Sequence, residues 1–410
     1  MPINEIQEQR GRNPSYRSIP FETNLLYKKY FVNLDLSRFE NKNTKEEVIE
    51  SYDESLLTNR YAKMGIKFSA VIYDGVLAKG TEAVHTGDTA YKERVRDGLP
   101  FDKFSAFAYD FSLEPIVVEF GSGKNELNML FLDSGMHNTP ASISFRVPKN
   151  VKATINEYYF SLDNGKESLN GAAQLFELDE NSELIVNEIH CESENTNSLV
   201  TRSFLTLDNA KLEFNAFYTG GATSRQRSVF NNSGKGSKIN VNESIIGSGT
   251  QKFDINTNIS NLKPNSSCNY EVRAVLADDS SGIVKSFAKM IKGTEGSESH
   301  IKERGLIYDK NAKITMMPDM SIDESYVKAS HSSSTSPIPE DDIFYISSRG
   351  LDKEKAKFLV GSGLIYELLK NIKNHDSMTF SMLLAKHRLE TKKIGVPEME
   401  LKSYGVWYDQ

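Results

Sequence analysis

The side chains that could carry chemistry in this 410-residue sequence are seven histidines and two cysteines. From spacing alone, each histidine is interpreted first as a surface or packed residue and not as a metal ligand; they are His85, His137, His190, His300, His331, His375 and His387. Cys191 follows His190, and strand neighbours point to opposite faces, so a simple strand cannot aim both at one metal. We interpret Cys191 and Cys268 as buried structural thiols. Two cysteines cannot supply a four-thiolate cluster site from one chain.

Common catalytic motifs do not occur in the sequence. The segment nearest to a P-loop, Gly121–Asn125, lacks the spacing and the terminal hydroxyl of G-x-x-x-x-G-K-[ST]. The motifs H-E-x-x-H, C-x-x-C and G-x-S-x-G are also missing. We therefore predict that this chain has no ATP site of the P-loop type.

Composition and charge narrow the class of protein. The net charge of -7 disfavours a nucleic-acid partner, because phosphate binding needs concentrated lysine and arginine. No apolar run approaches the roughly 18 residues that a membrane span requires. The first residues, MPINEIQEQRGRNP, hold no apolar signal-peptide core, so a cytoplasmic location is expected. A disulfide between the two cysteines stays open, although nothing else suggests export.

A repeated seven-residue template indicates the elements that position these side chains. It occurs at 150–156, 181–187, 209–215 and 236–242, and 311–316 repeats its first six positions. The first four copies start 31, 28 and 27 residues apart. A regular period of this size is typical of a stacked repeat architecture.

The template is a strand template. Its fourth and sixth positions are apolar in every copy, and alternation at period two indicates a half-buried strand. These pairs are Ala153 and Ile155, Leu184 and Val186, Leu212 and Phe214, Ile239 and Val241, Ile314 and Met316. Asn or Gly opens each copy, as a turn demands. The seventh position is always Asn in the four complete copies, so a hydrogen-bonded Asn ladder on the opposite face is expected. The pattern predicts a parallel β-helix; leucine-rich repeats need denser leucine.

The rest of the chain differs in character, which suggests three parts. We expect a mixed α/β N-terminal region over 1–100, a right-handed parallel β-helix over 101–338, and a C-terminal helical domain over 339–410. In the first part, Thr44 and Glu47 have capping-box spacing for a helix reaching about Leu57, and Leu25–Val32 is a short helix or an interaction surface.

The C-terminal part reads as a helical hairpin attached to one end of the β-helix. Asp352 is the expected N-cap of its first helix, and a second helix is expected to start near Ser377. Before the hairpin, the polar run Ser332–Ser336 is interpreted as a loop.

One stretch resembles a known family. It contains a proline strand, a histidine turn and an F-Y-x-x-S-R-G motif, carried by Pro318, Met320 and Ile322, by Val327, Ser330 and His331, and by Phe344, Tyr345, Ser348, Arg349 and Gly350. This order resembles the C-terminal core of SufD proteins in the SufB/SufD family of iron–sulfur cluster assembly proteins. The thirteen-residue step from Pro318 to His331 fits the family register without a gap. The resemblance extends more weakly back to about Phe101.

The departures from the family pattern favour a SufD-like member over a SufB-like one. Ala329 stands where the family often has cysteine, and Ser332 and Ser333 replace Gly-Ala after the histidine. Ala312 stands where SufB carries its scaffold cysteine. Three alternatives stay open: a SufB-like scaffold using Cys191, Cys268 or carboxylates, a β-helix polysaccharide lyase or hydrolase, and a homodimeric structural protein without the assembly role.

The resemblance implies a non-catalytic assembly subunit. Its cargo would be transient iron or an iron–sulfur cluster at a subunit interface, with His331 as the metal and cofactor ligand, because imidazole suits iron. It implies a SufC-type ATPase docking on the C-terminal helices and a SufB-like paralogue pairing along the β-helix, or a homodimer when alone. Arg349 and Gly350 are the expected partner-binding residues, with a structural role at the junction of β-helix and helix: backbone freedom for Gly350 and an ion pair for Arg349.

Overall fold

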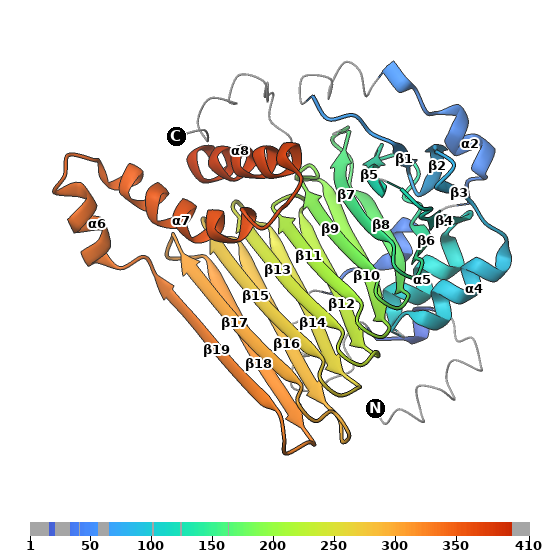
Figure 1. Cartoon of the computed structure of the whole chain (residues 1–410). Coiled ribbons are helices and arrows are strands. Elements are labelled where there is room, and N and C mark those ends of the chain that lie inside the picture. The colour runs from blue at the N-terminus through green and yellow to red at the C-terminus, as the bar shows by residue number, and fades with distance from the viewer. Residues whose placement is uncertain are drawn as a thin grey trace.

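Two long sheets stacked into a solenoid make up the body of the molecule (Figure 1). The computed structural model describes residues 16–20, 33–40, 42–55, 65–100, 102–123, 125–162 and 164–395. From β4 onward, strands that follow each other in sequence belong alternately to the two sheets, and each pairs in parallel with the strand two places away. The parallel β-helix predicted from the repeats is therefore confirmed.

The first sheet has ten strands in the order β19-β17-β15-β13-β11-β9-β7-β5-β1-β2. Their bounds are β1 Ala70–Tyr73, β2 Val76–Lys79, β5 Asn125–Asp133, β7 Lys152–Ser161, β9 Glu183–His190, β11 Lys211–Tyr218, β13 Lys238–Gly247, β15 Ser267–Leu276, β17 Glu298–Ile307 and β19 Lys328–Pro337. The second sheet has nine strands in the order β18-β16-β14-β12-β10-β8-β6-β4-β3. Their bounds are β3 Val84–Thr86, β4 Pro115–Glu119, β6 Ala141–Val147, β8 Ser168–Leu178, β10 Thr196–Thr206, β12 Thr223–Asn232, β14 Lys252–Asn261, β16 Ser281–Met290 and β18 Lys313–Ile322.

The four complete copies of the template lie in register in the ten-stranded sheet. Leu184, Leu212 and Ile239 are successive partners on the inner face and are buried, as predicted. The residues that open the copies have positive φ: Asn150 63°, Asn181 56°, Asn209 56° and Gly236 71°. Asn and Gly tolerate this conformation best, which explains why they open each copy.

The predicted Asn ladder is present on the outer face of this sheet. Nδ2 of Asn187 donates to Oδ1 of Asn156 at 2.8 Å, and Nδ2 of Asn215 donates to Oδ1 of Asn187 at 3.0 Å. Asn242 continues the ladder by donating to Asn215 at 2.9 Å. Each amide thus satisfies its neighbour while the strands keep one common register.

The fifth copy does not continue this row. Ile314 and Met316 lie on β18, which belongs to the nine-stranded sheet and pairs with β16. The two coils that do continue the row are β15 and β17. They place Cys268 with Tyr270, and Ser299 with Ile301, at the template's inward positions. The shared letters of the fifth copy reflect a common strand pattern and not a common place in the solenoid.

Short helices of the N-terminal region cover one end and one flank. They are η1 Tyr16–Ser18, η3 Leu36–Phe39, α2 Lys45–Glu50, α4 Thr89–Gly98 and α5 Lys103–Phe111. The capping box of Thr44 and Glu47 is confirmed, although α2 ends at Glu50. The expected continuation to Leu57 and the segment Leu25–Val32 lie outside the described residues.

The β-like reading of the residues just after 101 is wrong, because α5 occupies them. Asp102 caps this helix in a capping box with Ser105, and Phe104 and Phe107 bury its inner face. Their cluster includes Leu169 and Leu199, which lie on β8 and β10. The parallel strands of the solenoid begin only with β4 at Pro115.

The C-terminal hairpin is present but packs elsewhere than predicted. Its helices are α7 Lys353–Leu369 and α8 His375–Thr391, preceded by α6 Glu340–Ser347, and Asp352 caps α7 as expected. Instead of sitting on one end, α7 and α8 lie along the strand ends of the ten-stranded sheet (Figure 1). The reason is a row of outward apolar side chains on those strands that packs against the hairpin: Tyr158, Phe160, Ile189, Phe217, Ile246, Val275 and Leu306. No helix in the described part of the chain is long and apolar enough to cross a membrane.

Candidate functional site

The solenoid ends in an open coil formed by β18 and β19. Each is the last strand of its sheet, and within the described residues no further strand pairs with its free edge. Nearly every residue of β19 is exposed, whereas β17 beside it alternates buried and exposed positions. A free strand edge presents unpaired backbone donors and acceptors, which makes it a ready template for another chain.

His331 lies in this last strand and faces the inside of the coil. Its partner on β17 is Ile301, whose own partner on β15 is Tyr270, and both are buried core residues. His331 therefore occupies the inner row of the solenoid at the point where no further coil covers it. The side chain is exposed because the core row ends there, and not because it sits in a loop.

This placement corrects two predictions made from the sequence. Ser330 and His331 were expected in a turn, and Ser332–Ser336 in a loop, but all lie within β19. Serine is a common turn residue, so its density suggested a loop. Pairing with β17 along the whole strand, from Lys328 opposite Glu298 to Pro337 opposite Ile307, overrides that local preference.

The proline strand of the resemblance is confirmed, and it forms the opposite wall of the open coil. Pro318, Met320 and Ile322 share one face of β18, where Met320 packs against the core. Ile322 is exposed at the rim. One wall of the open end is therefore apolar. The wall formed by β19 is polar, because it presents His331, Ser333 and Thr335 inward.

A buried carboxylate lies behind this polar wall. Glu303 on β17 is the direct partner of Ser333 and is only 2% exposed. Its Oε1 accepts a hydrogen bond from Ser286 Oγ at 2.6 Å. Its Oε2 is buried without a well-aligned hydrogen bond. Burial raises the pKa of Glu303 to about 7, although the hydroxyls of Ser286 and Ser333 lower it.

The outer face of the last strand carries a different pair. Ser330 Oγ and Nδ1 of His300 lie 2.7 Å apart, and His300 belongs to β17. Because strand neighbours alternate between faces, His300 and Ser330 point outward while Ile301 and His331 point inward. His300 and His331 thus lie near each other on opposite faces of the same sheet.

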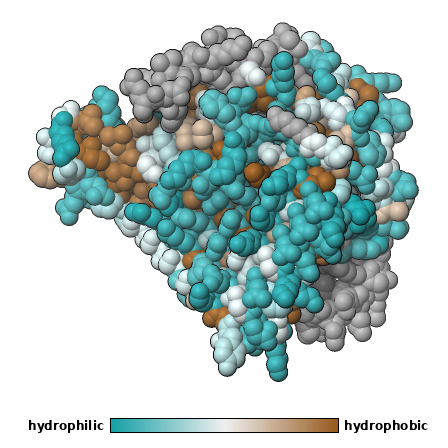
Figure 2. Space-filling model, viewed as in Figure 1, coloured by the Kyte–Doolittle hydropathy of each residue, from teal (hydrophilic) through white to brown (hydrophobic). Residues whose placement is uncertain are grey.

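The helix that follows β19, α6, projects from the body and has no buried residue (Figure 1). Phe344 is 76% exposed and Tyr345 58% exposed. Leu351 and Leu359 are also large apolar residues that remain exposed. Figure 2 shows hydrophobic surface gathered on this projecting part, which Figure 1 identifies as α6. An exposed apolar patch of this kind is typical of an interaction surface.

The two junction residues predicted near this helix lie elsewhere than expected. The chain passes from β19 into α6 at 338–339, whereas Arg349 and Gly350 join α6 to α7. Gly350 has φ of 93°, so the predicted need for backbone freedom is confirmed at this turn. Arg349 makes no ion pair with any described residue; its guanidinium stacks over the Tyr345 ring at 4.5 Å and donates to the Tyr345 hydroxyl.

The cysteines are not part of any exposed site. Cys268 is fully buried in the inner row of β15, and Cys191 is 1% exposed beneath the C-terminal hairpin. They form no disulfide. Burial raises the pKa of both thiols, so the reactive thiolate form is strongly disfavoured. The interpretation as buried structural thiols is confirmed. Ala312, at the position of the SufB scaffold cysteine, is buried at the turn before β18.

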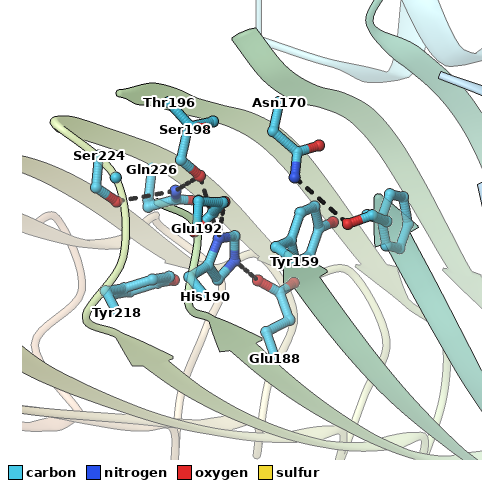
Figure 3. A network of polar contacts seen from close by, with 12 residues as sticks. Tyr159, Asn170, Glu188, His190, Glu192, Thr196, Ser198, Tyr218, Ser224 and Gln226 are labelled. Carbon is cyan, nitrogen blue, oxygen red and sulfur yellow. Dashed lines mark hydrogen bonds and ion pairs between the residues drawn. The ribbon is translucent and has the colours of Figure 1, made fainter. Parts of the chain in front are cut away.

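A second group of polar residues fills the interior of the solenoid (Figure 3). Nε2 of His190 lies 3.3 Å from Glu188 Oε2, and its Nδ1 lies 3.3 Å from Glu192 Oε1. Arg202 pairs with the same Glu188 oxygen at 2.7 Å, and the Tyr159 ring stacks on His190 with centroids 4.1 Å apart. Burial opposes the charged form, but Glu192 and Glu188 raise the pKa of His190.

This interior group is sealed from solvent, since His190, Glu188, Glu192 and Arg202 are all 0% exposed. The prediction of His190 as a packed histidine is confirmed. Because these side chains are enclosed, the network offers no access to cargo. Sequence reasoning missed its carboxylates, because Glu157, Glu188, Glu243 and Glu303 each stand two residues after an apolar template position, without any common motif.

The described residues hold no group of three or more His, Cys, Asp or Glu side chains that could bind a metal ion. Within that part of the chain, His331 is therefore not a member of such a group.

The sequence of this chain is similar to known proteins over much of the solenoid. Residues 132–364, more than half of the chain, match the family model described as SUF system FeS cluster assembly, SufBD core domain. SufD of Escherichia coli K12 is 19% identical over 224 residues, which cover 55% of this chain and 53% of that protein. SufD of Bacillus subtilis is 26% identical over 128 residues, which cover 31% of this chain and 29% of that protein.

Iron–sulfur cluster assembly SufBD family proteins of mycobacteria, including that of Mycobacterium tuberculosis strain H37Rv, are 25% identical over 134 residues, 33% of this chain. That match spans only 16% of the mycobacterial protein, and the chain spans about half of Escherichia coli SufD. The region that matches the family model, residues 132–364, contains most of the solenoid and ends within α7. The chain therefore belongs to the SufBD family of SUF-system iron–sulfur cluster assembly proteins.

Proposed function

We propose that this protein is a SufD-like, non-catalytic subunit of a cytoplasmic iron–sulfur cluster assembly complex. The observation that carries the proposal is the position of His331, an exposed imidazole in the inner row of a terminal strand whose outer edge pairs with no other described strand. An imidazole at such an edge can bind iron or a nascent cluster as cargo once a partner supplies further ligands. Neutral imidazole binds and exchanges readily, which suits transient binding.

The cysteine positions support a SufD-like over a SufB-like role. A scaffold subunit must offer thiolates to the cluster. Here Cys191 and Cys268 are buried with raised pKa values, and Ala312 stands at the position of the SufB scaffold cysteine. The thiolate ligands would therefore come from the partner, a SufB-like paralogue.

The free edges of β18 and β19 support strand pairing as the mode of partner binding. A paralogue that adds a strand to β19 would satisfy its unpaired backbone groups and would also cover His331. A cysteine of the partner could then approach His331 from the side where the next coil would stand. In the absence of the paralogue, a second copy of this chain could use the same edge.

The apolar surface of α6 supports docking of a SufC-type ATPase. Phe344 and Tyr345 are exposed, and the Arg349 guanidinium stacks on the Tyr345 ring. ATP-driven movement of the ATPase would act through α6, which follows β19 directly in the chain. Motion would thus reach the strand that carries His331 through only two connecting residues.

The test is the iron and sulfide content of the assembled complex purified with His331→Ala. We expect cluster content to fall while the complex still assembles, because an exposed substitution changes stability by only about 0.5 kcal/mol. His300→Ala is the matched control, since His300 lies one strand away on the opposite face. His375→Ala, an exposed histidine on α8, is a distant control. Equal cluster content in all four proteins would refute the proposed role of His331.

A further inference from the structure

Glu303 is an inner-face carboxylate on β17, the strand that pairs with the last strand β19. Its direct partner on β19 is Ser333, and His331 lies two residues earlier on the same face of that strand. Diagonal neighbours of this kind are about 7–8 Å apart between Cα atoms. Both side chains can therefore reach a single ion between them, with the Ser333 hydroxyl beside it.

The carboxylate of Glu303 differs from the other carboxylates of the inner row in its partners. Glu243, two coils deeper, accepts from three hydroxyls: Tyr218 at 3.2 Å, Tyr270 at 2.7 Å and Thr257 at 3.1 Å. Glu188 is paired with Arg202. Glu303 is contacted by the hydroxyls of Ser286 and Ser333, its Oε2 has no well-aligned hydrogen bond, and the residue is only 2% exposed. Glu188 also has one oxygen without a hydrogen bond, but it has a charged partner in Arg202, which Glu303 lacks among the described residues.

An incompletely satisfied buried carboxylate needs a counter-charge or a further donor. Within the described residues no Lys or Arg forms an ion pair with Glu303. The coils below it are sealed by core residues, so the open coil is the side from which a cation can approach. The residue that covers it on that side is Ser333, which is small and exposed.

We propose that Glu303 is a second ligand, with His331, for divalent iron held at the open end of the solenoid. This assignment rests on the proposed function, because it takes His331 as the cargo site. One imidazole nitrogen, one carboxylate oxygen and the Ser333 hydroxyl form a mixed nitrogen and oxygen donor set, which suits divalent iron. The remaining positions would be filled by water in the isolated chain and by the partner's ligands in the complex.

A bound ion would account for a carboxylate that is buried at this position without a charged partner among the described residues. An ion of charge +2 would stabilise ionised Glu303 and orient its carboxylate toward the open end of the solenoid. The ion would in turn be fixed on two adjacent strands of one sheet, which is a more rigid mounting than a single exposed histidine. A cysteine from a partner would meet an ion that is already oriented.

The experiment is a titration of the isolated, untagged full chain with Co²⁺, a stable substitute for divalent iron, followed by calorimetry and by the Co²⁺ absorption bands. Wild type is expected to bind one ion. Glu303→Gln and His331→Ala should each weaken binding by at least about tenfold. Glu303→Asp, which keeps the charge with a shorter reach, should weaken binding less than Glu303→Gln. Glu243→Gln is the matched control and should bind as wild type does.

Thermal unfolding without metal shows whether each variant is folded. If Glu303→Gln does not fold, Glu303→Asp tests whether Glu303 is a ligand. Wild-type affinity in a folded Glu303→Gln protein would overturn the proposal, as would the lack of any Co²⁺ binding by wild type; if Glu303→Gln does not fold, wild-type affinity in Glu303→Asp would overturn it. If His331→Ala alone weakens binding, Glu303 is not a ligand and the cargo site at His331 stands. If His331→Ala changes neither Co²⁺ binding nor the iron content of the complex, the proposed function fails as well.

Discussion

The hydroxyl oxygens of Tyr158 and Ser377 lie 2.6 Å apart, although 219 positions separate the two residues in the sequence. Tyr158 points outward from β7, and Ser377 lies in the first turn of α8. This buried contact ties the C-terminal hairpin to the early coils of the solenoid. Further along, Nε of Arg388 donates to Thr219 Oγ1 at 2.7 Å, so α8 is attached at both ends.

Deleting residues 352–410 should therefore damage the whole protein and not only partner binding. The outward apolar row of the ten-stranded sheet would be left exposed, including Phe160, Ile189 and Phe217. We expect insoluble protein, or a soluble fraction that unfolds at a much lower temperature. The measurements are the soluble yield and thermal unfolding followed by circular dichroism. A well-folded, soluble truncation would show that the hairpin is a separate module.

Docking of an ATPase is better tested on α6, whose side chains are exposed. The double substitution Phe344→Ser with Tyr345→Ser should reduce capture of a co-expressed SufC-type ATPase by at least about tenfold, because large aromatic residues dominate protein interfaces. Folding should be unchanged, since no residue of α6 is buried. The control is Met136→Ser, an exposed apolar residue at the other end of the solenoid. Undiminished capture would place the docking surface elsewhere.

The Asn ladder should be most sensitive in its middle. Asn187→Ala removes a buried amide that both donates to Asn156 and accepts from Asn215, and leaves two neighbours with lost hydrogen bonds. We expect a loss of about 1–3 kcal/mol in the free energy of unfolding, measured by urea denaturation. Asn242→Ala should cost less, because this half-buried residue stands at the end of the ladder. Equal costs would show that burial in the ladder contributes little.

Stability should fall as the pH rises toward about 8 and change little above that value because of two groups, Glu157 and Asp74. Burial, and then the Glu188 carboxylate, raises the pKa of Glu157 from 4.5 to about 8 in the folded protein. Burial and the Asp133 carboxylate likewise raise the pKa of Asp74 from 3.8 to about 7. A group whose pKa is higher in the folded state stabilises the fold fully below its unfolded pKa. That contribution is lost as the pH passes through the folded value.

The measurement is the urea midpoint of unfolding between pH 6 and 9. We expect the wild-type midpoint to fall up to a pH of about 8 and the Glu157→Gln midpoint to fall less, because the amide cannot ionise. Glu183→Gln is the control. Hydrogen bonds from Lys152 and Lys211 lower the pKa of Glu183, so it stays ionised throughout this range. An identical slope for wild type and Glu157→Gln would contradict the assignment.

Much of the fold could be predicted because one sheet repeats its chemistry. Asn or Gly at each turn and apolar residues at two inward positions marked β7, β9, β11 and β13. The template missed β15 and β17, where Cys268 and Ser299 stand at the first inward position. The other sheet gave a weaker signal, because inward positions such as Gln174 and Arg202 are polar and take part in the buried network.

The sequence was enough to select His331 as the candidate residue, but not to predict its position in the fold. The resemblance selected His331, yet a dense run of serines suggested a turn. Whether it lies in a turn or at the end of a core row depends on pairing with β17, which is a contact between distant parts of the chain. No local sequence pattern marks Glu303 as a candidate ligand. Its candidacy depends on pairing with Ser333 in the last described strand of the sheet.

The large sequence separation between β7 and α8, which pack together, also has a consequence for synthesis on the ribosome. Each solenoid strand from β6 onward can pair as soon as it emerges, because its neighbour two strands earlier is already in place. The outer apolar row has no such early partner. At a synthesis rate of about 5–20 residues per second, the 219 positions between Tyr158 and Ser377 correspond to a delay of roughly 10–45 seconds. During this interval we expect the nascent chain to display a folded but uncovered hydrophobic face, a surface of the kind that chaperones bind.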